Sequence, residues 1–532
     1  MKVSIQLRAF PLVLAAFALV SASSCTHRQP EGSPTPLRKI ASAEAELQNE
    51  ELESVDEEEA AQLEPGAPEE IKDSRGRNSK IRNDFEELFG QYPEEKIKAC
   101  SMAIDNILKL NFFSEGRGMM ISPGLISLYR DVPRIAKKSL ITRSFGLNFI
   151  DGRAQGLFWE KYKKNTIGVL GCVACHSGQA AGYYVVGLGN KNIDVQAIGS
   201  FTHDVEDVWK GIRFEKEKRD PVYKELTDDS IDFAKTLSNP SYTNLTQGLV
   251  PTGIIRTWFY RQAGKPIPED LPRAAVKVPF LWGYGEKKKL GQFADGGGNG
   301  ALPGWAVAVE LVANQRPETI RKYFPKIQAA EEIFSALLPP RYPFEIKVER
   351  AARGKTQFEN TCAHCHGTYE RTADGVPVFK EPTWIKLEIV KTDSDRLNAL
   401  EGEFLDLVAN NPLKDILQSK YRGRGYFAPR LEGIWARFPY LHNGSVPSIR
   451  FLLTTPMDRP KTFSVRAAGS RERFDPDNLG LTMLKKAKFD LFGGERSTYD
   501  TSLIGQSNSG HDFYTDLSDD QKTDLIEYLK TL

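Results

Sequence analysis

The chain has 532 residues, a length that predicts two or three domains rather than one. Its hydrophobic content of 40% and aromatic content of 10% are typical of a globular protein. The net charge is +1, and no run of Lys and Arg is interleaved with aromatic residues, which argues against a nucleic-acid partner. Six cysteines occur and four of them lie in two Cys-x-x-Cys-His pentapeptides, so a disulfide framework is not predicted.

The first 25 residues are typical of an export signal. Lys2 and Arg8 give a positive start, residues 10–20 form an apolar core too short to span a bilayer, and small residues follow at 21–24. The run ends at Cys25, which resembles a bacterial lipoprotein cleavage site. We therefore expect a protein of the periplasm or cell envelope that meets the membrane only through a lipid on Cys25. The alternative is an ordinary secreted protein in which Cys25 has no role.

Residues 26–80 have the composition of a disordered acidic linker. About a dozen acidic residues, and no Lys or Arg, lie between Glu44 and Glu70, and aromatic residues are almost absent. Such a segment would suit a tether between a lipid anchor and a folded body, and it is equally a solvated acidic tail.

Helical patterns begin after the linker. Apolar residues recur at helical spacing over 85–108, and Cys100 lies on the apolar face, which predicts a buried structural thiol. A second helical pattern covers 348–358, and a third closes the chain, where Ser518 and Gln521 are spaced as a capping box. The apolar stripe of this last helix is formed by Leu525, Ile526, Leu529 and Leu532.

The two pentapeptides have the spacing of c-type haem attachment. Two cysteines three positions apart on one helical turn can reach both vinyl groups of a porphyrin, and the next residue can direct its imidazole to the iron. Zinc would need further ligands close by, and a redox dithiol would not need the adjacent histidine. We therefore predict two covalently bound haem c groups, one in an N-terminal domain at 81–347 and one in a C-terminal cytochrome c domain at 348–532. Their attachment residues are Cys172, Cys175, His176, Cys362, Cys365 and His366.

The predicted fold is mostly α, with two cytochrome c-like haem domains and long irregular loops. A loose duplication favours two related halves. Val-Pro-Phe-Leu-Trp at 278–282 leads to Phe-Ala-Asp-Gly at 293–296, and Ala-Pro-Arg-Leu-Glu-Gly-Ile-Trp at 428–435 leads to Tyr-Leu-His-Asn-Gly at 440–444.

Residues 426–446 read YFAPRLEGIWARFPYLHNGSV. This segment closely resembles the second haem half of the bacterial dihaem cytochrome c peroxidase superfamily, which also holds the methylamine-utilisation dihaem enzyme and the dihaem rubber oxygenases. Residues 439–476 and the Gly-His-Asp-Phe at 510–513 look most like the rubber oxygenase branch. The resemblance covers roughly residues 165–532, and its C-terminal motifs are the specific ones.

The resemblance implies ligands for the C-terminal haem. In the rubber oxygenase branch the histidine that matches His511 is the second iron ligand, so a six-coordinate His366/His511 haem would transfer electrons. In true peroxidases a methionine placed like Met457 takes this role, so Met457 competes with His511 and is otherwise a packing residue. His442 is expected to bond backbone or a haem propionate rather than iron.

The haem on His176 would then be the reactive one. Its other face is open or bound by His203, which is otherwise a polar surface residue. Trp282 loosely matches the tryptophan that carries electrons between the haems in this superfamily, and its alternative is a core residue.

Three further residues are catalytic candidates near this haem. A peroxidase needs a distal acid or base, and Asp295 and Glu310 are the carboxylates in the right stretch, although neither matches a family pattern. Phe293 would form an apolar distal wall, which favours O2 over peroxide.

The predicted function is a dihaem oxidoreductase, peroxidase-like or oxygenase-like, that acts on peroxide or O2 and exchanges electrons with a small periplasmic protein. The alternatives are a non-catalytic periplasmic dihaem electron carrier and a haem protein that senses or scaffolds. The region 177–347 is longer than one haem pocket requires, which favours the enzyme.

Overall fold

The computed structural model divides the chain into two units, Met1–Asn78 and Ser79–Leu532, and describes parts of the second. The predicted export signal, Cys25, nearly all of the linker, and Glu310 lie outside the described residues. No helix among the described residues is long and apolar enough to cross a membrane. The described residues are 79–111, 120–121, 141–142, 145–203, 219–239, 245–301, 316–371, 377–380, 383–418, 420–484 and 495–532.

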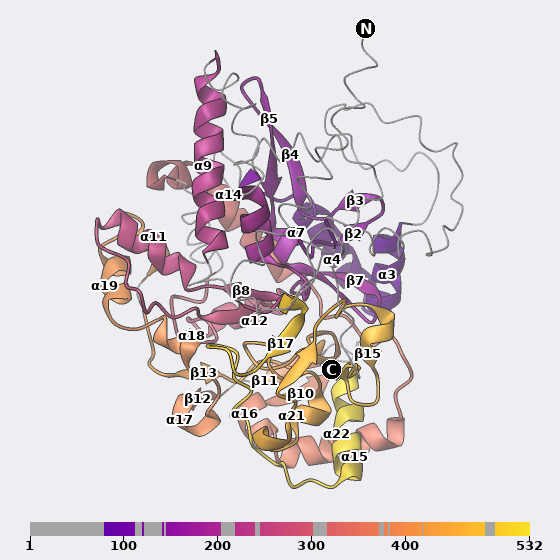
Figure 1. Ribbon diagram of the computed structural model, residues 1–532. Helices are drawn as coiled ribbons and strands as arrows, with labels where there is room; N and C mark the ends of the chain where they lie inside the picture. The colour runs from indigo at the N-terminus through magenta and orange to yellow at the C-terminus, as the bar shows by residue number, and fades with distance from the viewer. Residues whose placement is uncertain are drawn as a thin grey trace, which may run out of the picture. The chain divides into compact units, whose positions relative to one another are not determined.

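Short strands accompany the helices, so the fold is mixed, and the prediction of a mostly α fold is corrected (Figure 1). Strands β1, β5 and β4 form a three-stranded antiparallel sheet, and the others form two-stranded ribbons. Several ribbons close through turns at positive φ, such as Asp151 and Gly152 at 50° and 77°. Two-residue turns of this kind build hairpins locally, and strands this short leave no long alternating pattern in the sequence.

The strands are β1 (Met120–Ile121), β2 (Phe149–Ile150), β3 (Arg153–Ala154), β4 (Leu157–Tyr162), β5 (Asn165–Leu170), β6 (Ser177–Ala180), β7 (Tyr183–Val186), β8 (Leu249–Pro251), β9 (Ala275–Lys277), β10 (Thr368–Arg371), β11 (Pro377–Lys380), β12 (Trp384–Lys386), β13 (Gly425–Phe427), β14 (Thr462–Ser464), β15 (Phe474–Asp475), β16 (Gly480–Leu481) and β17 (Thr498–Asp500).

Two helices precede the first pentapeptide, as the helical pattern predicts. Helix α3 (Lys80–Phe89) is capped by the Ser79 hydroxyl, and α4 (Glu94–Ile107) packs against α14 (Pro317–Ser335). Cys100 of α4 is fully buried, and this burial raises the pKa of its thiol to about 11. The prediction of a buried structural thiol is therefore confirmed.

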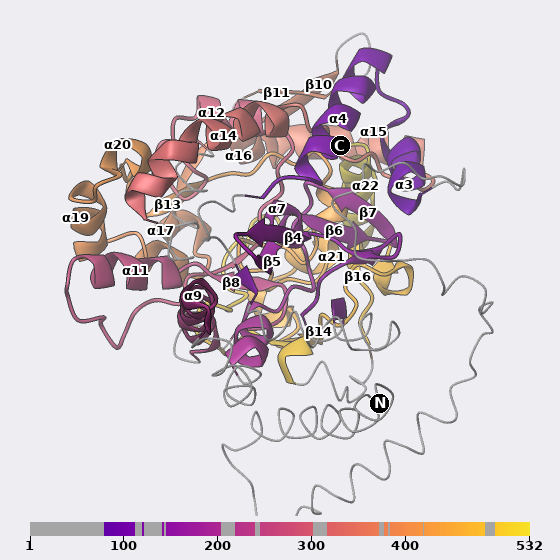
Figure 2. The same ribbon diagram turned by 90° about the horizontal axis from the view of Figure 1, so that it is seen from above.

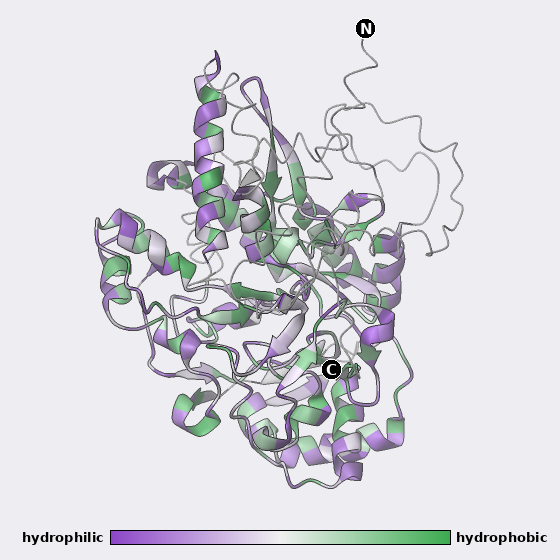
Figure 3. Cartoon of the chain, in the orientation of Figure 1, coloured by the Kyte–Doolittle hydropathy of each residue, from purple (hydrophilic) through white to green (hydrophobic). Residues whose placement is uncertain are grey.

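The stretch between the pentapeptides carries amphipathic helices. Hydrophilic and apolar residues mix along α9 (Figure 3), whose buried residues include Leu226 and Leu237. Helices α11 and α19 lie side by side in both views (Figures 1 and 2). The helices here and early in the C-terminal half are α9 (Pro221–Ser238), α11 (Ile254–Gln262), α12 (Tyr284–Lys289), α17 (Leu387–Val390), α18 (Asp395–Asn398), α19 (Glu403–Ala409) and α20 (Lys414–Leu417).

Helix α15 (Val348–Asn360) leads into the second pentapeptide and crosses the last helix, α22 (Asp519–Lys530). A Cβ at Gly354 would lie 1.9 Å from the carbonyl oxygen of Asp524, so the two backbones touch at the crossing. The capping box and the buried apolar stripe of α22 are as predicted. Val348, by contrast, is 76% exposed, so the buried face of α15 is narrower than the helical pattern suggests.

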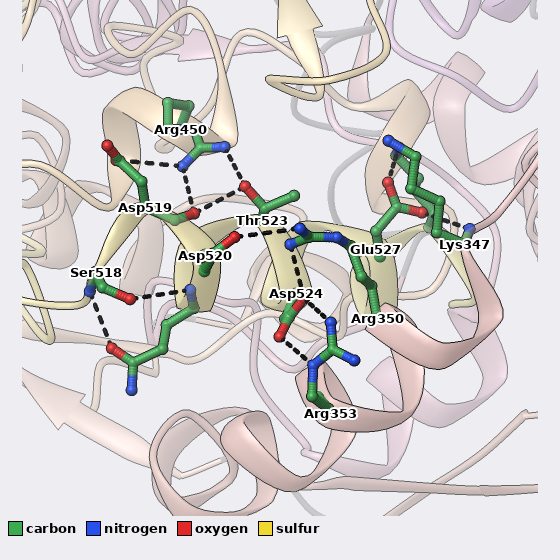
Figure 4. A network of polar contacts seen from close by, with 12 residues as sticks. Lys347, Arg350, Arg353, Arg450, Ser518, Asp519, Asp520, Thr523, Asp524 and Glu527 are labelled. Atoms are coloured by element: carbon green, nitrogen blue, oxygen red, sulfur yellow. Dashed lines mark hydrogen bonds and ion pairs between the residues drawn. The ribbon is translucent and has the colours of Figure 1, made fainter.

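Ion pairs join the same two helices (Figure 4). Arg350 and Arg353 of α15 both bind the Asp524 carboxylate of α22, with N–O distances of 3.0 and 2.7 Å. Arg450, from α21 (Ile449–Leu452), donates to the Thr523 hydroxyl at 2.8 Å. Apolar and polar contacts therefore fix the helix that delivers the second pentapeptide.

One hydrophobic core cluster extends through both predicted halves and includes Cys100, Trp282, Trp435 and Leu525. The two pentapeptides are therefore held by one continuous core. The predicted domain boundary at 347/348 stays a prediction.

Candidate functional site

The first pentapeptide forms α7 (Cys172–Cys175), a single helical turn that ends at His176. The imidazole Nδ1 of His176 lies 3.0 Å from the carbonyl oxygen of Pro279. A carbonyl oxygen only accepts, so Nδ1 carries the proton and Nε2 keeps a lone pair for a metal. Burial is the main reason that the pKa of His176 falls to about 4, and the ring is thus neutral, as a metal ligand must be.

The second pentapeptide has the same arrangement. Helix α16 (Ala363–His366) ends on the histidine, whose Nδ1 lies 2.9 Å from the carbonyl oxygen of Pro429. Burial lowers the pKa of His366 as well. Both histidines are therefore neutral, and each keeps the Nε2 lone pair free to bind a metal.

The two proline carbonyls belong to equivalent segments. Four residues after each proline, Gly283 and Gly433 both have a φ of 65°, and they begin α12 and the short helix η3 (Ile434–Ala436). Pro279 and Pro429 thus lie in two segments that share the same local backbone conformation. This is the structural counterpart of the duplication seen in the sequence.

The motif thiols do not resemble a redox pair. None of the four is joined in a disulfide, and burial raises the pKa of Cys175 to about 12 and also raises those of Cys362 and Cys365. A reactive dithiol requires a lowered pKa. In the described ranges no three His, Cys, Asp or Glu side chains are grouped as a metal site, as zinc would need. The thiols fit thioether attachment to a porphyrin.

His511 faces His366. Their ring centroids are 6.2 Å apart, and the rings are inclined at 46°. Two metal-to-imidazole bonds of about 2 Å, with half a ring on either side, add up to roughly this separation. Met457 is 90% exposed in the short helix η4 (Pro456–Asp458), so of the two candidate ligands only His511 lies opposite His366.

Four cations lie near the two motifs: Lys191 is buried and the other three are half-buried, and the charge of Lys287 acts on His176 while that of Arg437 acts on His366. Lys191, Lys277 and Lys287 donate to backbone carbonyl oxygens, and Arg437 donates to the carbonyl oxygen of Arg430. Desolvation lowers the pKa of Lys191 to about 7 and also lowers those of Lys277 and Lys287. Glu432 supplies one counter-charge to Lys287 and Arg437, and the propionates of two haems would add further negative charge beside these cations. The residues present therefore fit the cofactors that the pentapeptides imply.

Trp282 touches both halves of this arrangement. It is 1% exposed, and its Nε1 donates to the carbonyl oxygen of Glu432 at 2.9 Å. A Cβ at Gly433 would lie 3.0 Å from the indole, while the Leu281 N–H donates to Gly187 in the strand segment that follows His176. The indole thus lies between the segments that hold His176 and His366.

Two predicted catalytic residues, Phe293 and Asp295, line an apolar cavity of about 110 Å³. Asp295 is committed to an ion pair with Arg396, with an Nε–O distance of 3.0 Å, and it also accepts the N–H of Gly297. A carboxylate fixed in this way is poorly suited to shuttle protons. Half of the remaining lining residues are apolar, namely Ile255, Phe259, Ala399, Leu400, Phe404, Leu405, Val408 and Leu417, and the other half are polar residues and glycines.

His442 stacks on Tyr426, with ring centroids 5.3 Å apart, close enough to Asp295 to feel its charge. Burial is the main reason that the pKa of His442 falls to about 3. Neither its Nε2 nor the Tyr426 hydroxyl has a hydrogen-bond partner in the described part of the chain. These two polar atoms fit an external hydrogen-bonding group such as a propionate.

His203 is described at the edge of a gap, and its role as a ligand stays a prediction. The sequence did not single out Arg396, Tyr426 or the buried lysines, because lone basic and aromatic residues carry no spacing signal. The prolines could have been found, since each occupies the first position of a repeated Pro-x-Leu segment.

Residues 425–464 match a protein-family model described as RoxA-like, cytochrome c-like. This segment contains Pro429 and His442. Two relatives from Sinorhizobium fredii (strain NBRC 101917 / NGR234) bear the names uncharacterized protein y4iJ and uncharacterized protein y4iM. The chain is 45% identical to y4iJ over 20% of its own length and 18% of that protein, and 26% identical to y4iM over 50% of its own length and 66% of that protein. The family match supports a relationship to cytochromes c of the rubber oxygenase type.

Proposed function

We propose that the chain is an exported dihaem c-type cytochrome oxidoreductase whose N-terminal haem binds O2 or peroxide and whose C-terminal haem relays electrons. The proposal rests above all on the repeated hydrogen bond from a Cys-x-x-Cys-His imidazole to a proline carbonyl, 3.0 Å for His176 and 2.9 Å for His366. A bound haem supplies redox chemistry: an open iron face binds O2 or peroxide, whereas an iron with two strong ligands only passes electrons.

The protein's own residues divide the labour. His366 and His511 would hold one iron from both sides, and His176 would hold the other from one side. Trp282 lies between the two proximal segments and would carry electrons across. The surface of the cavity beside Phe293 is mostly apolar, and Asp295 is tied to Arg396, which favours O2 over peroxide as the oxidant.

The cellular setting is part of the proposal. The predicted export signal and Cys25 support a location in the periplasm or cell envelope, with a lipid on Cys25 as the proposed membrane contact. A small soluble electron carrier would be its protein partner.

Haem content and ligand binding test the proposal. Wild-type protein should carry two haems per chain, and the paired variants Cys172→Ser/Cys175→Ser and Cys362→Ser/Cys365→Ser should each carry one. After reduction, the variant that keeps the N-terminal haem should bind carbon monoxide readily, and the variant that keeps the C-terminal haem should not. One haem in the wild type would overturn the dihaem assignment, and two haems that both refuse carbon monoxide would indicate an electron carrier.

A further inference from the structure

Arg459 is buried, with 2% of its surface exposed, and its guanidinium donates hydrogen bonds to backbone carbonyl oxygens. Its Nε donates to Phe451 at 3.2 Å, and its Nη2 donates to Leu452 and Thr454 at 3.3 and 3.2 Å. These three carbonyls belong to α21 and the turn that follows it, at a helix end where few intrahelical donors remain.

The other side of the same guanidinium holds the loop that carries His511. Nη1 donates to the carbonyl oxygens of Asn508 and Gly510, both at 2.7 Å, and Nη2 donates to that of His511 at 2.9 Å. A planar fork with five N–H groups can bridge two backbone segments in this way, whereas an ammonium group cannot. Arg459 therefore clamps the His511 loop to the end of α21.

The loop needs such a clamp. Gly510 and His511 both have positive φ, at 73° and 47°, and a non-glycine residue rarely adopts this conformation. The loop is also pressed against Val390, whose carbonyl oxygen accepts the His511 N–H at 2.7 Å and would lie 2.3 Å from a Cβ on Gly510. Backbone held in this region persists only where its surroundings fix it.

The imidazole of His511 has no side-chain tether of its own. His176 and His366 are each oriented through Nδ1 by a proline carbonyl, but the Nδ1 of His511 bonds no other residue of the described chain. Metal-binding histidines are usually oriented by such a partner. The position of His511 therefore depends on its backbone, which is held by the hydrogen bonds from Arg459 together with the bond to Val390.

We propose that Arg459 is a positioning residue that holds His511 opposite His366, so that His511 serves as the second ligand of the C-terminal haem. The inference rests on the His366/His511 ligation in the proposed function. Arg459 touches neither the iron nor a substrate, and its effect passes through the loop at 508–511.

The test compares the oxidised, haem-loaded variants Arg459→Met and Arg459→Lys with wild type by EPR and visible absorption. Arg459→Met should lose most of the low-spin signal and gain a high-spin one. Arg459→Lys should fall between the two, because an ammonium group reaches only part of the carbonyl set. Added imidazole should restore the low-spin signal of the C-terminal haem in both variants when they also carry Cys172→Ser/Cys175→Ser, which removes the open N-terminal haem, and this rescue separates a missing ligand from a damaged pocket.

Arg473→Met is the matched control. Arg473 is also buried and also donates to backbone carbonyls, those of Arg466, Ser464 and Thr482, none of which lies in the His511 loop. This variant should lose stability and keep the wild-type spin state.

The variant His511→Ala distinguishes an error in the role of Arg459 from an error in the assignment of His511 as a ligand. If His511→Ala loses the low-spin signal while the Arg459 variants keep it, Arg459 does not position the ligand. If His511→Ala keeps the signal, the ligand assignment in the proposed function is itself wrong. If Arg459→Met does not fold, Arg459→Lys decides, and an unchanged spectrum in that variant contradicts the proposal.

Discussion

The indole Nε1 of Trp282 donates a 2.9 Å hydrogen bond to the carbonyl oxygen of Glu432, 150 residues further along the chain. Glu432 lies three residues after Pro429, which holds His366, and Trp282 lies three residues after Pro279, which holds His176. The bond therefore joins the two segments that would orient the two irons. If two haems are bound as proposed, this indole is a buried aromatic group in contact with both segments and could carry an electron between them.

We expect Trp282→Phe to slow electron transfer between the haems several-fold. The variant keeps an aromatic core residue but loses the indole hydrogen bond, at a cost of about 1 kcal/mol in unfolding free energy. The measurement is the rate at which an electron delivered to the C-terminal haem reaches the N-terminal one, followed by rapid-mixing absorption. Unchanged static spectra are the control, and an unchanged rate would contradict the role of Trp282.

Gly354→Ala should destabilise the C-terminal half. The new Cβ would collide with the carbonyl oxygen of Asp524, so α15 and α22 must separate, and overpacking of this kind costs about 1–3 kcal/mol. Gly285→Ala in α12 is the control, because its Cβ meets nothing closer than 3.9 Å and helix propensity improves by roughly 1 kcal/mol. Urea unfolding of both variants measures the difference. Equal stability of the two variants would argue against the helix crossing.

The Asp524 cluster gives a prediction about pH. The hydrogen bond from Arg353, followed by the charges of Arg353 and Arg350, lowers the pKa of Asp524 in the folded chain below its unfolded value of about 3.9. This contribution is present above that value and is lost as the pH falls through the lowered folded pKa. Asp524→Asn should therefore be less stable than wild type at pH 7, by roughly 1 kcal/mol because water screens the half-exposed Arg353.

The same difference should shrink in acid. Thermal unfolding at pH 7 and near pH 3 measures it, with Glu388→Gln as the control, because Glu388 and its partner Lys386 are both well exposed. A difference between Asp524→Asn and wild type that stays constant over this range would show that the ionised carboxylate is not what stabilises the crossing.

The sequence predicts those parts of the fold that repeat at short range. The helical stripes of α4 and α22, the capping box at Ser518 and the burial of Cys100 follow from spacing alone, and all are found in the structure. The short ribbons were missed, because a two-residue turn such as Asp151-Gly152 fixes a hairpin without a long alternating pattern.

The candidate site divides in the same way. The pentapeptides are local signals, whereas the approach of His511 to His366 joins residues from opposite ends of the C-terminal half, and only the family resemblance suggested it. The role of Arg459 could not be predicted from the sequence. Its partners are backbone carbonyls, and no sequence pattern marks where these carbonyls lie in the fold. Long-range contacts of this kind become visible only in the folded chain.

EPR and visible absorption of the oxidised protein, before and after His511→Ala, report directly on the iron ligands proposed for the two haems. We expect one high-spin and one low-spin ferric haem in the wild type, loss of the low-spin signal in His511→Ala, and an unchanged spectrum in the control Met457→Ala, whose side chain is exposed. Two low-spin haems that stay unreactive toward O2 and peroxide after partial reduction would contradict an open catalytic centre and leave an electron carrier.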